Sequence, residues 1–216
     1  MSVSRPLALE ERQNAGTRLS SPSAGRNRAV IASALAGILP ASARVLEIAS
    51  GTGEHGLACV LARPGIHWTP SEPDARARAS IDDWAREAAN AIAPALDLDV
   101  TQQGWWKGAP QELDAVFCAN MIHIAPWGAA EGLAAGAGEV LGEGGLLVLY
   151  GPFLEGESTA PSNLAFDESL KARNPLWGVR ALEDVTALAA RHGFALHQRI
   201  AMPANNLILV FVKGAA

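Results

Sequence analysis

The regular alternation of short apolar segments with segments of helical periodicity is the feature that most constrains the fold of this chain. Apolar residues recur at helical spacing between Asn27 and Leu39, and Pro40 ends the pattern. A short apolar strand follows over residues 44–49. The pattern then repeats, with strands predicted over 66–71, 95–100, 113–119 and 146–150, and helices over 54–61, 74–92 and 127–141. This order indicates an α/β fold with a mostly parallel sheet covered on both faces.

The two ends of the chain depart from this alternation. Residues 1–24 are rich in Ser, Arg, Pro and Gly, and we predict an N-terminal arm there, either disordered or folded over the site. Residues 25–216 form a single predicted domain. Within it, the stretch 151–180 is too long for an ordinary connection, which is typical of a lid. After a helix over 182–191, strands over 194–200 and 207–212 are joined by a short link, which predicts a C-terminal antiparallel strand.

Composition narrows the class of protein. Of 216 residues, 49% are apolar and 18% are charged, which excludes a disordered chain. The net charge is −5 and no basic block occurs, so nucleic acid is not expected as a partner. No apolar run is long enough to cross a membrane, and the two cysteines lie in apolar segments. We therefore expect a cytoplasmic protein with free thiols that acts on a small molecule.

The sharpest motif follows the first predicted strand. Gly51, Gly53 and Gly56 match the G-x-G-x-x-G pattern of a ligand-binding turn, although a plain strand-to-helix turn gives the same spacing. Glu47 lies on the strand itself, where a carboxylate would repel the pyrophosphate of a nicotinamide cofactor. It would suit a ligand with a cationic amino group and no phosphate, such as S-adenosylmethionine (SAM).

Two further acidic residues follow the next predicted strands. Glu72 ends the strand 66–71 and is placed to accept hydrogen bonds from both hydroxyls of a ribose. The alternative is a cluster that caps the next helix through Asp74, and both roles are compatible. Asp99, near the end of the strand 95–100, is a candidate for the adenine amino group, with a solvated loop acid as the alternative.

These motifs resemble those of class I SAM-dependent methyltransferases. The segment from Glu47 to Gly53, with an acid ending the next strand, carries the resemblance, and Ala49 stands where many members have Gly. Together with Arg26-Asn27, Asn120 to Trp127, Leu149 to Phe153, Pro175 to Arg180 and Pro203 to Asn206, the chain resembles one small family known as a domain of unknown function or as methyltransferase-like.

The resemblance runs from about residue 20 to the C-terminus and implies a Rossmann-like methyltransferase sheet with SAM as cofactor. It carries no established substrate. The cofactor-binding residues that we expect from the motifs and the resemblance are Arg26, Asn27, Glu47, Ala49, Ser50, Gly51, Gly53, His55, Glu72, Asp99 and Asn120.

Candidate catalytic residues follow the fourth and fifth strands. Asn120 is expected to hydrogen-bond the substrate and His123 to accept its proton, since an ordinary histidine pKa suits that task. The alternative is a structural Asn turn followed by a capping His. Tyr150, the only tyrosine, either orients substrate or tethers its loop.

The remaining candidates for substrate binding lie mainly in and around the predicted lid. Mixed aromatic, amide and arginine groups there suit a small polar or anionic substrate, although Arg180 and Asp167 as a structural pair and Asn205 as a turn former are alternatives. The expected substrate-binding residues are His123, Trp127, Tyr150, Phe153, Asn163, Trp177, Arg180 and Asn205.

The sequence therefore predicts methyl transfer from SAM to a nucleophilic N, O or S atom of a small molecule. Two alternatives remain, a non-catalytic SAM-binding regulator or partner protein and an NAD-dependent oxidoreductase. No metal site is expected, because the five histidines show no ligand spacing.

Overall fold

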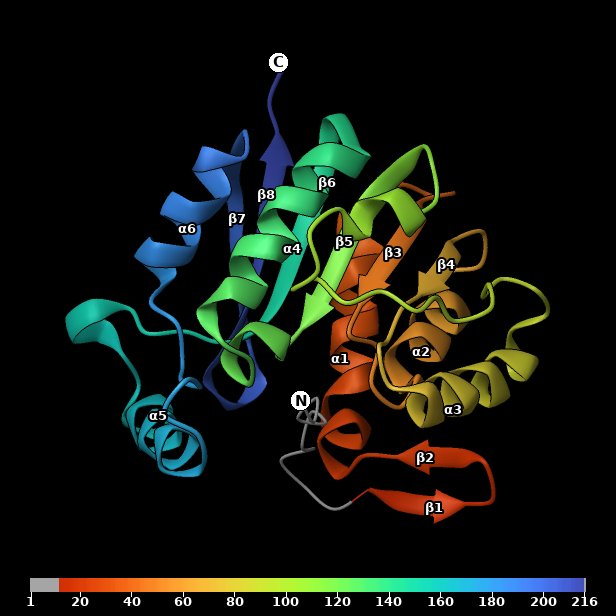
Figure 1. Cartoon of the computed structure of the whole chain (residues 1–216), viewed down its shortest axis with the longest axis horizontal. Coiled ribbons are helices and arrows are strands. Elements are labelled where there is room, and N and C mark those ends of the chain that lie inside the picture. Colours follow the sequence, from red (N-terminus) through yellow and green to blue (C-terminus); the bar gives the residue numbers. More distant parts are fainter. Residues whose placement is uncertain (1–11, 216) are drawn as a thin grey trace. The chain divides into compact units, whose positions relative to one another are not determined.

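The computed structural model describes residues 12–215 (Figure 1). Two compact units are distinguished in the chain, Met1–Asp99 and Val100–Ala216. Residues 1–11 of the predicted N-terminal arm lie outside the described residues. In the part that the structure describes, no helix is both long and apolar enough to cross a membrane.

The first unit begins with a small hairpin and a long helix. β1 (Gln13–Ala15) pairs antiparallel with β2 (Arg18–Ser20). α1 (Pro22–Ile38) follows directly, with a proline in its first turn, where a missing N–H costs no intrahelical hydrogen bond. The described end of the predicted arm is therefore folded, and the helix begins before Asn27, where the sequence placed its start.

The two strands at the centre of this unit form a parallel pair. β3 (Arg44–Ile48) and β4 (His67–Pro70) are joined through α2 (Glu54–Ala62). They pair in parallel, with Glu47 opposite Pro70. Because parallel strands end at the same edge, the segments that follow β3 and β4 emerge side by side, and their backbones are joined where Ser50 N–H donates to the Ser71 carbonyl at 2.9 Å.

The next helix is shorter than the sequence predicted. α3 (Ala75–Ala85) continues into a 3-10 turn over Arg86–Ala88. Ala89 and Asn90 then adopt left-handed backbone conformations with φ of 45° and 71°. Two consecutive residues in this region end a right-handed helix.

The predicted strand over 95–100 is wrong. The chain there runs beside β4 as an irregular segment, with only an isolated parallel bridge between Leu96 and Ser71 within that range. Pro94, just before it, has no N–H to donate, which interrupts a regular ladder. Leu96 N–H still donates to the Pro70 carbonyl at 2.9 Å, so the segment stays attached to β4.

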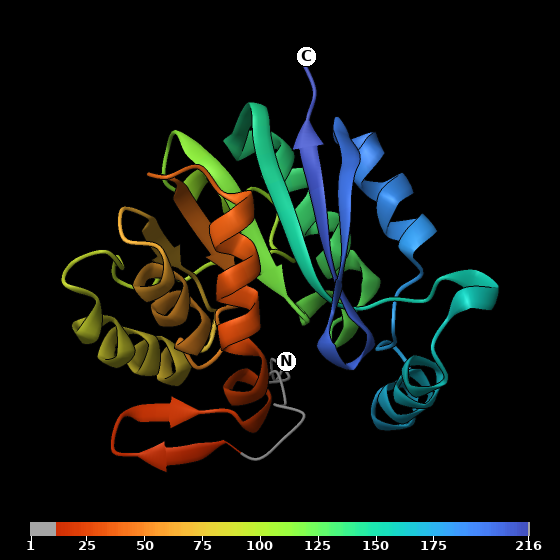
Figure 2. The ribbon, with the colours of Figure 1, turned by 180° about the vertical axis from the view of Figure 1, so that it is seen from behind.

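The second unit is built on four strands in the order β5-β6-β8-β7. β5 (Leu113–Ala119) pairs in parallel with β6 (Leu141–Pro152). β8 (Asn206–Lys213) runs antiparallel to both β6 and β7 (Phe194–Met202). Figure 2 shows these strands from behind. The predicted hairpin with its antiparallel C-terminal strand is confirmed.

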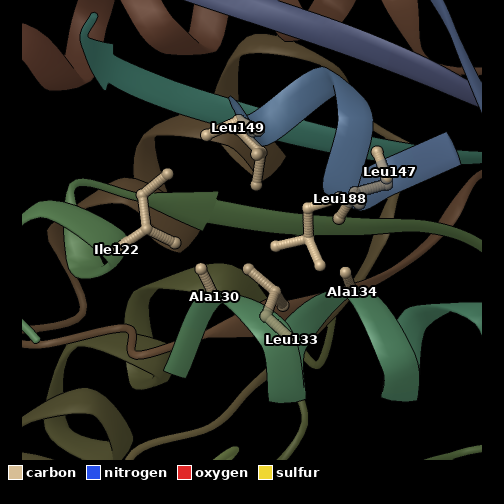
Figure 3. Close-up of a pocket in the computed structure, with 9 residues that line it drawn as sticks. Ile122, Ala130, Leu133, Ala134, Leu147, Leu149 and Leu188 are labelled. Atoms are coloured by element: carbon tan, nitrogen blue, oxygen red, sulfur yellow. The ribbon is translucent and has the colours of Figure 1, made fainter. Parts of the chain in front are cut away.

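Two helices cover one face of this sheet. α4 (Trp127–Val140) and α6 (Leu182–Arg191) lie in front of the strands in Figure 1 and behind them in Figure 2. The small cavity between them and the sheet has a volume of about 10 Å³ and is lined by aliphatic side chains, including Ile122, Leu147 and Leu188 (Figure 3). An apolar space of this size is a packing defect of the core and no ligand site.

Small residues on α4 make room for an aromatic side chain. Trp105 lies so close to the helix that a Cβ atom on Gly136 would stand 2.1 Å from its ring. Its indole N–H donates to the Gly132 carbonyl at 2.8 Å. The glycine content of this helix is therefore a packing requirement.

The predicted lid has its own helix. α5 (Pro161–Arg173) lies within the stretch 151–180, after a 3-10 turn over Gly156–Ser158. Backbone hydrogen bonds join Leu154 to the region that follows, with its N–H donating to the Arg180 carbonyl at 3.0 Å. The stretch 151–180 is therefore an ordered insertion that contains a helix. Taken together, the strand pairings confirm the predicted mixed α/β class with a mostly parallel sheet.

Candidate functional site

The first group of candidate residues surrounds the loop after β3. Ala49, Gly51 and Gly53 all have positive φ, at 56°, 61° and 97°. A Cβ atom on Gly53 would stand 2.8 Å from the backbone Cα of Ile81, so this position requires glycine. The positive φ at Ala49 is a conformation that favours glycine.

Glu72 fastens this loop to the end of β4. Its Oε2 accepts a hydrogen bond from Gly51 N–H at 3.0 Å, and its Oε1 accepts one from Asp74 N–H at 3.3 Å. The Asp74 carboxylate in turn caps α3 by accepting from Ala77 N–H at 2.8 Å. Burial raises the pKa of Glu72, and the Arg12 guanidinium acts in the opposite direction. The structure shows the Asp74 cap, whereas ribose binding by Glu72 stays a prediction.

Glu47 is more enclosed than its predicted role requires. Its side chain is buried, and Oε2 accepts a hydrogen bond from the Trp68 indole N–H at 2.9 Å. Burial raises the pKa of Glu47 to about 7. A Cβ atom on Gly56 would lie 2.7 Å from that indole nitrogen, so the third glycine of the motif makes room for tryptophan. Contact between Glu47 and a ligand stays a prediction.

His55 and Asn27 meet beside this loop. Nε2 of His55 lies 2.8 Å from Oδ1 of Asn27, which joins α2 to α1. Burial lowers the pKa of His55 to about 4, so the ring is neutral at neutral pH. The structure thus brings together two residues that the sequence named separately. Arg26 is exposed on α1, and Asp99 is half-buried in the irregular segment after Leu96.

One member of this group was missed by the sequence reasoning. Glu54 is buried, although it lies at the start of a helix. Its carboxylate accepts hydrogen bonds from the Thr52 hydroxyl at 2.9 Å and the Ser21 N–H at 2.7 Å, and it pairs with Arg28 at 3.1 Å. An acid in the first helical turn was the available signal, and its buried partners come from segments distant in sequence.

The second group of candidates lies in the unit Val100–Ala216, after β5. Asn120 has a φ of 61°, and its N–H donates to the Tyr150 carbonyl at 2.8 Å. A Cβ atom on Gly151 would stand 2.6 Å from Nε2 of His123 and 3.2 Å from Oδ1 of Asn120. The structure therefore gathers Asn120, His123 and the Tyr150-Gly151 backbone at one edge of the sheet.

His123 is held in a defined protonation state. Its Nδ1 accepts a hydrogen bond from Arg180 N–H at 3.2 Å, and its ring packs edge-on to Phe153 at 5.1 Å between centroids. Burial lowers the pKa of His123 to about 3, with the Arg180 charge acting in the same direction. The neutral ring therefore carries its proton on Nε2, which is buried and has no hydrogen-bond partner among the described residues. This arrangement favours a donor role for His123.

Arg180 ties the turn after β5 to the end of the predicted lid. Its guanidinium donates to the carbonyls of Ile122 at 2.9 Å and Ala125 at 2.7 Å, and lies 5.7 Å from the Trp127 ring. Asp167 accepts hydrogen bonds from Val179 N–H at 2.9 Å and Lys171 at 2.6 Å. These contacts hold the segment around Arg180 in place.

An open groove of about 820 Å³ lies along this segment. Its lining includes Trp127, Lys171, Arg180, Asp184 and Arg191. Three of these residues are cationic, which suits the polar or anionic substrate expected from the sequence. Trp127 and Arg180 both line this groove, and their role in substrate binding stays a prediction.

The other predicted substrate-binding residues are buried or form hydrogen bonds within the protein. Asn163 is buried and its amide donates to the carbonyls of Phe153 at 3.3 Å and Asn205 at 3.0 Å. The Asn205 amide donates to the Ser162 hydroxyl at 2.8 Å. Tyr150 and Trp177 are buried. No cluster of metal-ligating side chains occurs among residues 12–215.

One protein-family model matches most of the chain. A family model described as "Protein of unknown function (DUF938)" matches residues 18–213. This range contains both groups of candidate residues.

Comparison with solved structures shows the methyltransferase-type fold. The pyocyanin biosynthetic protein PhzM matches with a TM-score of 0.73 and 17% identity over 89% of this chain and 59% of that one. CalO1, a methyltransferase in calicheamicin biosynthesis in its SAH-bound form, matches with a TM-score of 0.73 and 16% identity, over 89% and 54%. An O-methyltransferase family protein from Burkholderia thailandensis matches with a TM-score of 0.74 and 11% identity, over 90% and 57%. This chain spans less than two thirds of the length of each.

Proposed function

The chain belongs to this family of proteins of unknown function, and we propose that it is a SAM-dependent methyltransferase that acts on a small molecule. The observation that carries the proposal is the loop after β3, where positive-φ glycines and the buried Glu72 carboxylate meet. The names of CalO1 and of the Burkholderia protein support the same reaction class.

The residues at this loop fit the chemistry of SAM. Its ribose hydroxyls need hydrogen-bond acceptors, and Glu72 offers a carboxylate beside the Gly51 backbone. Its cationic groups favour nearby carboxylates, and Glu72 supplies one at the loop. No Lys accompanies the glycines as it would in a phosphate-binding loop. When bound, SAM supplies a methyl group already activated by its sulfonium.

In this proposal the group around β5 and β6 recognises the methyl acceptor. His123 donates a hydrogen bond through Nε2, Asn120 offers its side-chain amide, and the groove along Arg180 receives a polar or anionic portion of the substrate. The acceptor itself is a nucleophilic N, O or S atom. Because the donor is already activated, the protein need only orient the reacting groups and exclude water.

Calorimetric titration with SAM, S-adenosylhomocysteine (SAH) and NAD tests the cofactor. We expect SAM and SAH to bind and NAD to fail. Glu72→Gln should weaken SAH about 10- to 100-fold, the usual effect of losing a hydrogen bond to a charged group. Glu139→Gln, an exposed acid on α4, is the matched control and should bind as the wild type does. Binding of NAD without SAM would support an oxidoreductase instead.

A screen of thiol, amine, hydroxyl and carboxylate acceptors with labelled SAM tests the reaction. Transfer to a small molecule, abolished or strongly reduced by Asn120→Ala, is the expected result. If SAM binds with high affinity and no acceptor in any class is methylated, the alternative of a SAM-binding regulator gains support.

A further inference from the structure

The short hairpin β1–β2 is fixed to α3 by an ion pair, hydrogen bonds and a buried side chain. Arg18 forms an ion pair with Asp83 at 2.9 Å, and its guanidinium carbon lies 4.1 Å from the centroid of the Trp84 ring. Leu19 is buried, with its N–H donating to the Ser80 hydroxyl at 2.8 Å and its carbonyl accepting from the Trp84 indole. The hairpin is therefore an anchored part of the unit Met1–Asp99.

This anchoring holds Arg12 near the glycine loop. Arg12 directly precedes β1, and its Nη2 lies 3.9 Å from the position that a Cβ atom on Gly51 would occupy. Its charge also acts on the Glu72 carboxylate, against the effect of burial. A guanidinium thus stands at the open side of the first glycine, beside the proposed ribose-binding acid.

Two other arginines of the described part of the unit Met1–Asp99 are engaged by the protein. Arg28 pairs with the buried Glu54 at 3.1 Å. Arg78 donates to the Glu72 carbonyl at 2.7 Å and pairs with Asp97 at 3.0 Å. Of these three described arginines, Arg12 is the one whose guanidinium lies toward Gly51.

SAM presents three charges at its amino-acid end, the cationic ammonium and sulfonium and an anionic carboxylate. The Glu72 carboxylate beside the loop suits the cations and would repel the carboxylate of SAM. A guanidinium matches a carboxylate through two parallel hydrogen bonds, which a point charge cannot supply.

We propose that Arg12 binds the carboxylate of the methionyl group of SAM. The inference rests on the proposed function, because it assigns a residue to that cofactor. In this proposal the anchored hairpin holds an arginine at the cofactor loop, although the hairpin lies outside the β-α-β core. The sequence reasoning did not identify Arg12.

Two ligands separate this role from a general effect on the pocket. SAH carries the carboxylate, whereas 5′-methylthioadenosine keeps the adenosine and the thioether and lacks the amino-acid end. By calorimetry, Arg12→Gln should weaken SAH about 10- to 100-fold and change the affinity for 5′-methylthioadenosine less than twofold. Arg12→Lys should fall between wild type and Arg12→Gln for SAH. Arg173→Gln, at an exposed arginine on α5, should match the wild type.

Each other outcome decides the matter. If Arg12→Gln binds both ligands more tightly, Arg12 blocks the loop and the inference is overturned. An equal loss for both ligands would show that Arg12 shapes the pocket, which also overturns it. If Arg12→Gln binds SAH like the wild type, Arg12 plays no part. Failure of the wild type to bind either ligand would instead refute the proposed function itself.

Discussion

The backbone N–H of Arg180 donates a hydrogen bond to Nδ1 of His123 at 3.2 Å. This contact favours one tautomer of the buried ring, because a nitrogen that accepts cannot also carry the proton. The proton of neutral His123 is then on Nε2, where the described residues offer no acceptor. A buried donor left without a partner costs about 1–3 kcal/mol, and an acceptor atom of a ligand would recover that cost.

The low pKa of His123 predicts a loss of stability in acid. The unfolded ring takes up a proton near its ordinary pKa of 6.5, whereas the folded ring does so only near 3. Protons therefore favour unfolding as the pH falls below 6.5, by about 1 kcal/mol per pH unit. Urea unfolding at pH 7.5 and 5.0 should show a smaller acid-induced loss for His123→Gln than for the wild type. His67→Gln, an exposed histidine, should retain the wild-type pH dependence. An identical change in the free energy of unfolding between pH 7.5 and 5.0 in all three proteins would contradict the prediction.

Gly151 cannot accept a side chain without disturbing both neighbouring candidates. In Gly151→Ala the new Cβ would lie 2.6 Å from Nε2 of His123 and 3.2 Å from Oδ1 of Asn120. We expect a loss of about 1–3 kcal/mol in the free energy of unfolding, measured in urea, together with reduced methyl transfer. Gly142→Ala is the control on the same strand, since a Cβ there meets nothing within 4 Å. Equal free energies of unfolding for the two variants would contradict this prediction.

Glu47 predicts the opposite pH dependence from His123. Burial raises its pKa from 4.5 to about 7, so the folded protein keeps a proton that the unfolded chain releases. Stability is therefore lost as the pH rises from 4.5 to 7, by about 1 kcal/mol per pH unit. Glu47→Gln keeps an acceptor for the Trp68 indole and cannot ionise. Its stability relative to the wild type should increase between pH 5 and 7.5 in urea unfolding, whereas exposed Glu143→Gln should show no such trend.

Ala49 predicts a stabilising substitution. Its φ of 56° lies in the left-handed region, which costs a side-chain-bearing residue about 1–2 kcal/mol. Ala49→Gly removes that strain and adds freedom to the unfolded chain, so we expect a net gain of about 1 kcal/mol in thermal or urea unfolding. Ala129→Gly, a buried alanine in α4 with helical backbone, should lose stability. A loss at both positions would contradict the assigned strain.

The strand and helix pattern was readable where local signals agree. Pro40 ends α1, the glycine turn follows β3, and the short link between β7 and β8 gives the hairpin. The prediction failed at 95–100, where apolar residues suggested a strand but Pro94 and attachment to β4 give an irregular edge. The hairpin β1–β2 was also missed, because its stability comes from the contacts of Arg18 and Leu19 with α3.

Part of the candidate site was equally readable. Glycines after an apolar strand and an acid after the next strand identify the loop and Glu72, because backbone sterics and strand order fix both. Glu54 and Arg12 were not found, since nothing in their local sequence shows which distant groups they meet.

The sequence by itself determined the α/β class, the glycine loop and the residues that carry polar chemistry, because periodicity and backbone sterics are local properties. Only the tertiary structure decided the chemical state of those residues. The Arg180 N–H and burial favour a neutral His123 with its proton on Nε2, and burial beside Trp68 raises the pKa of Glu47. Proton affinity and hydrogen-bond roles depend on solvent exclusion and on partners far along the chain, and these exist only once the chain has folded.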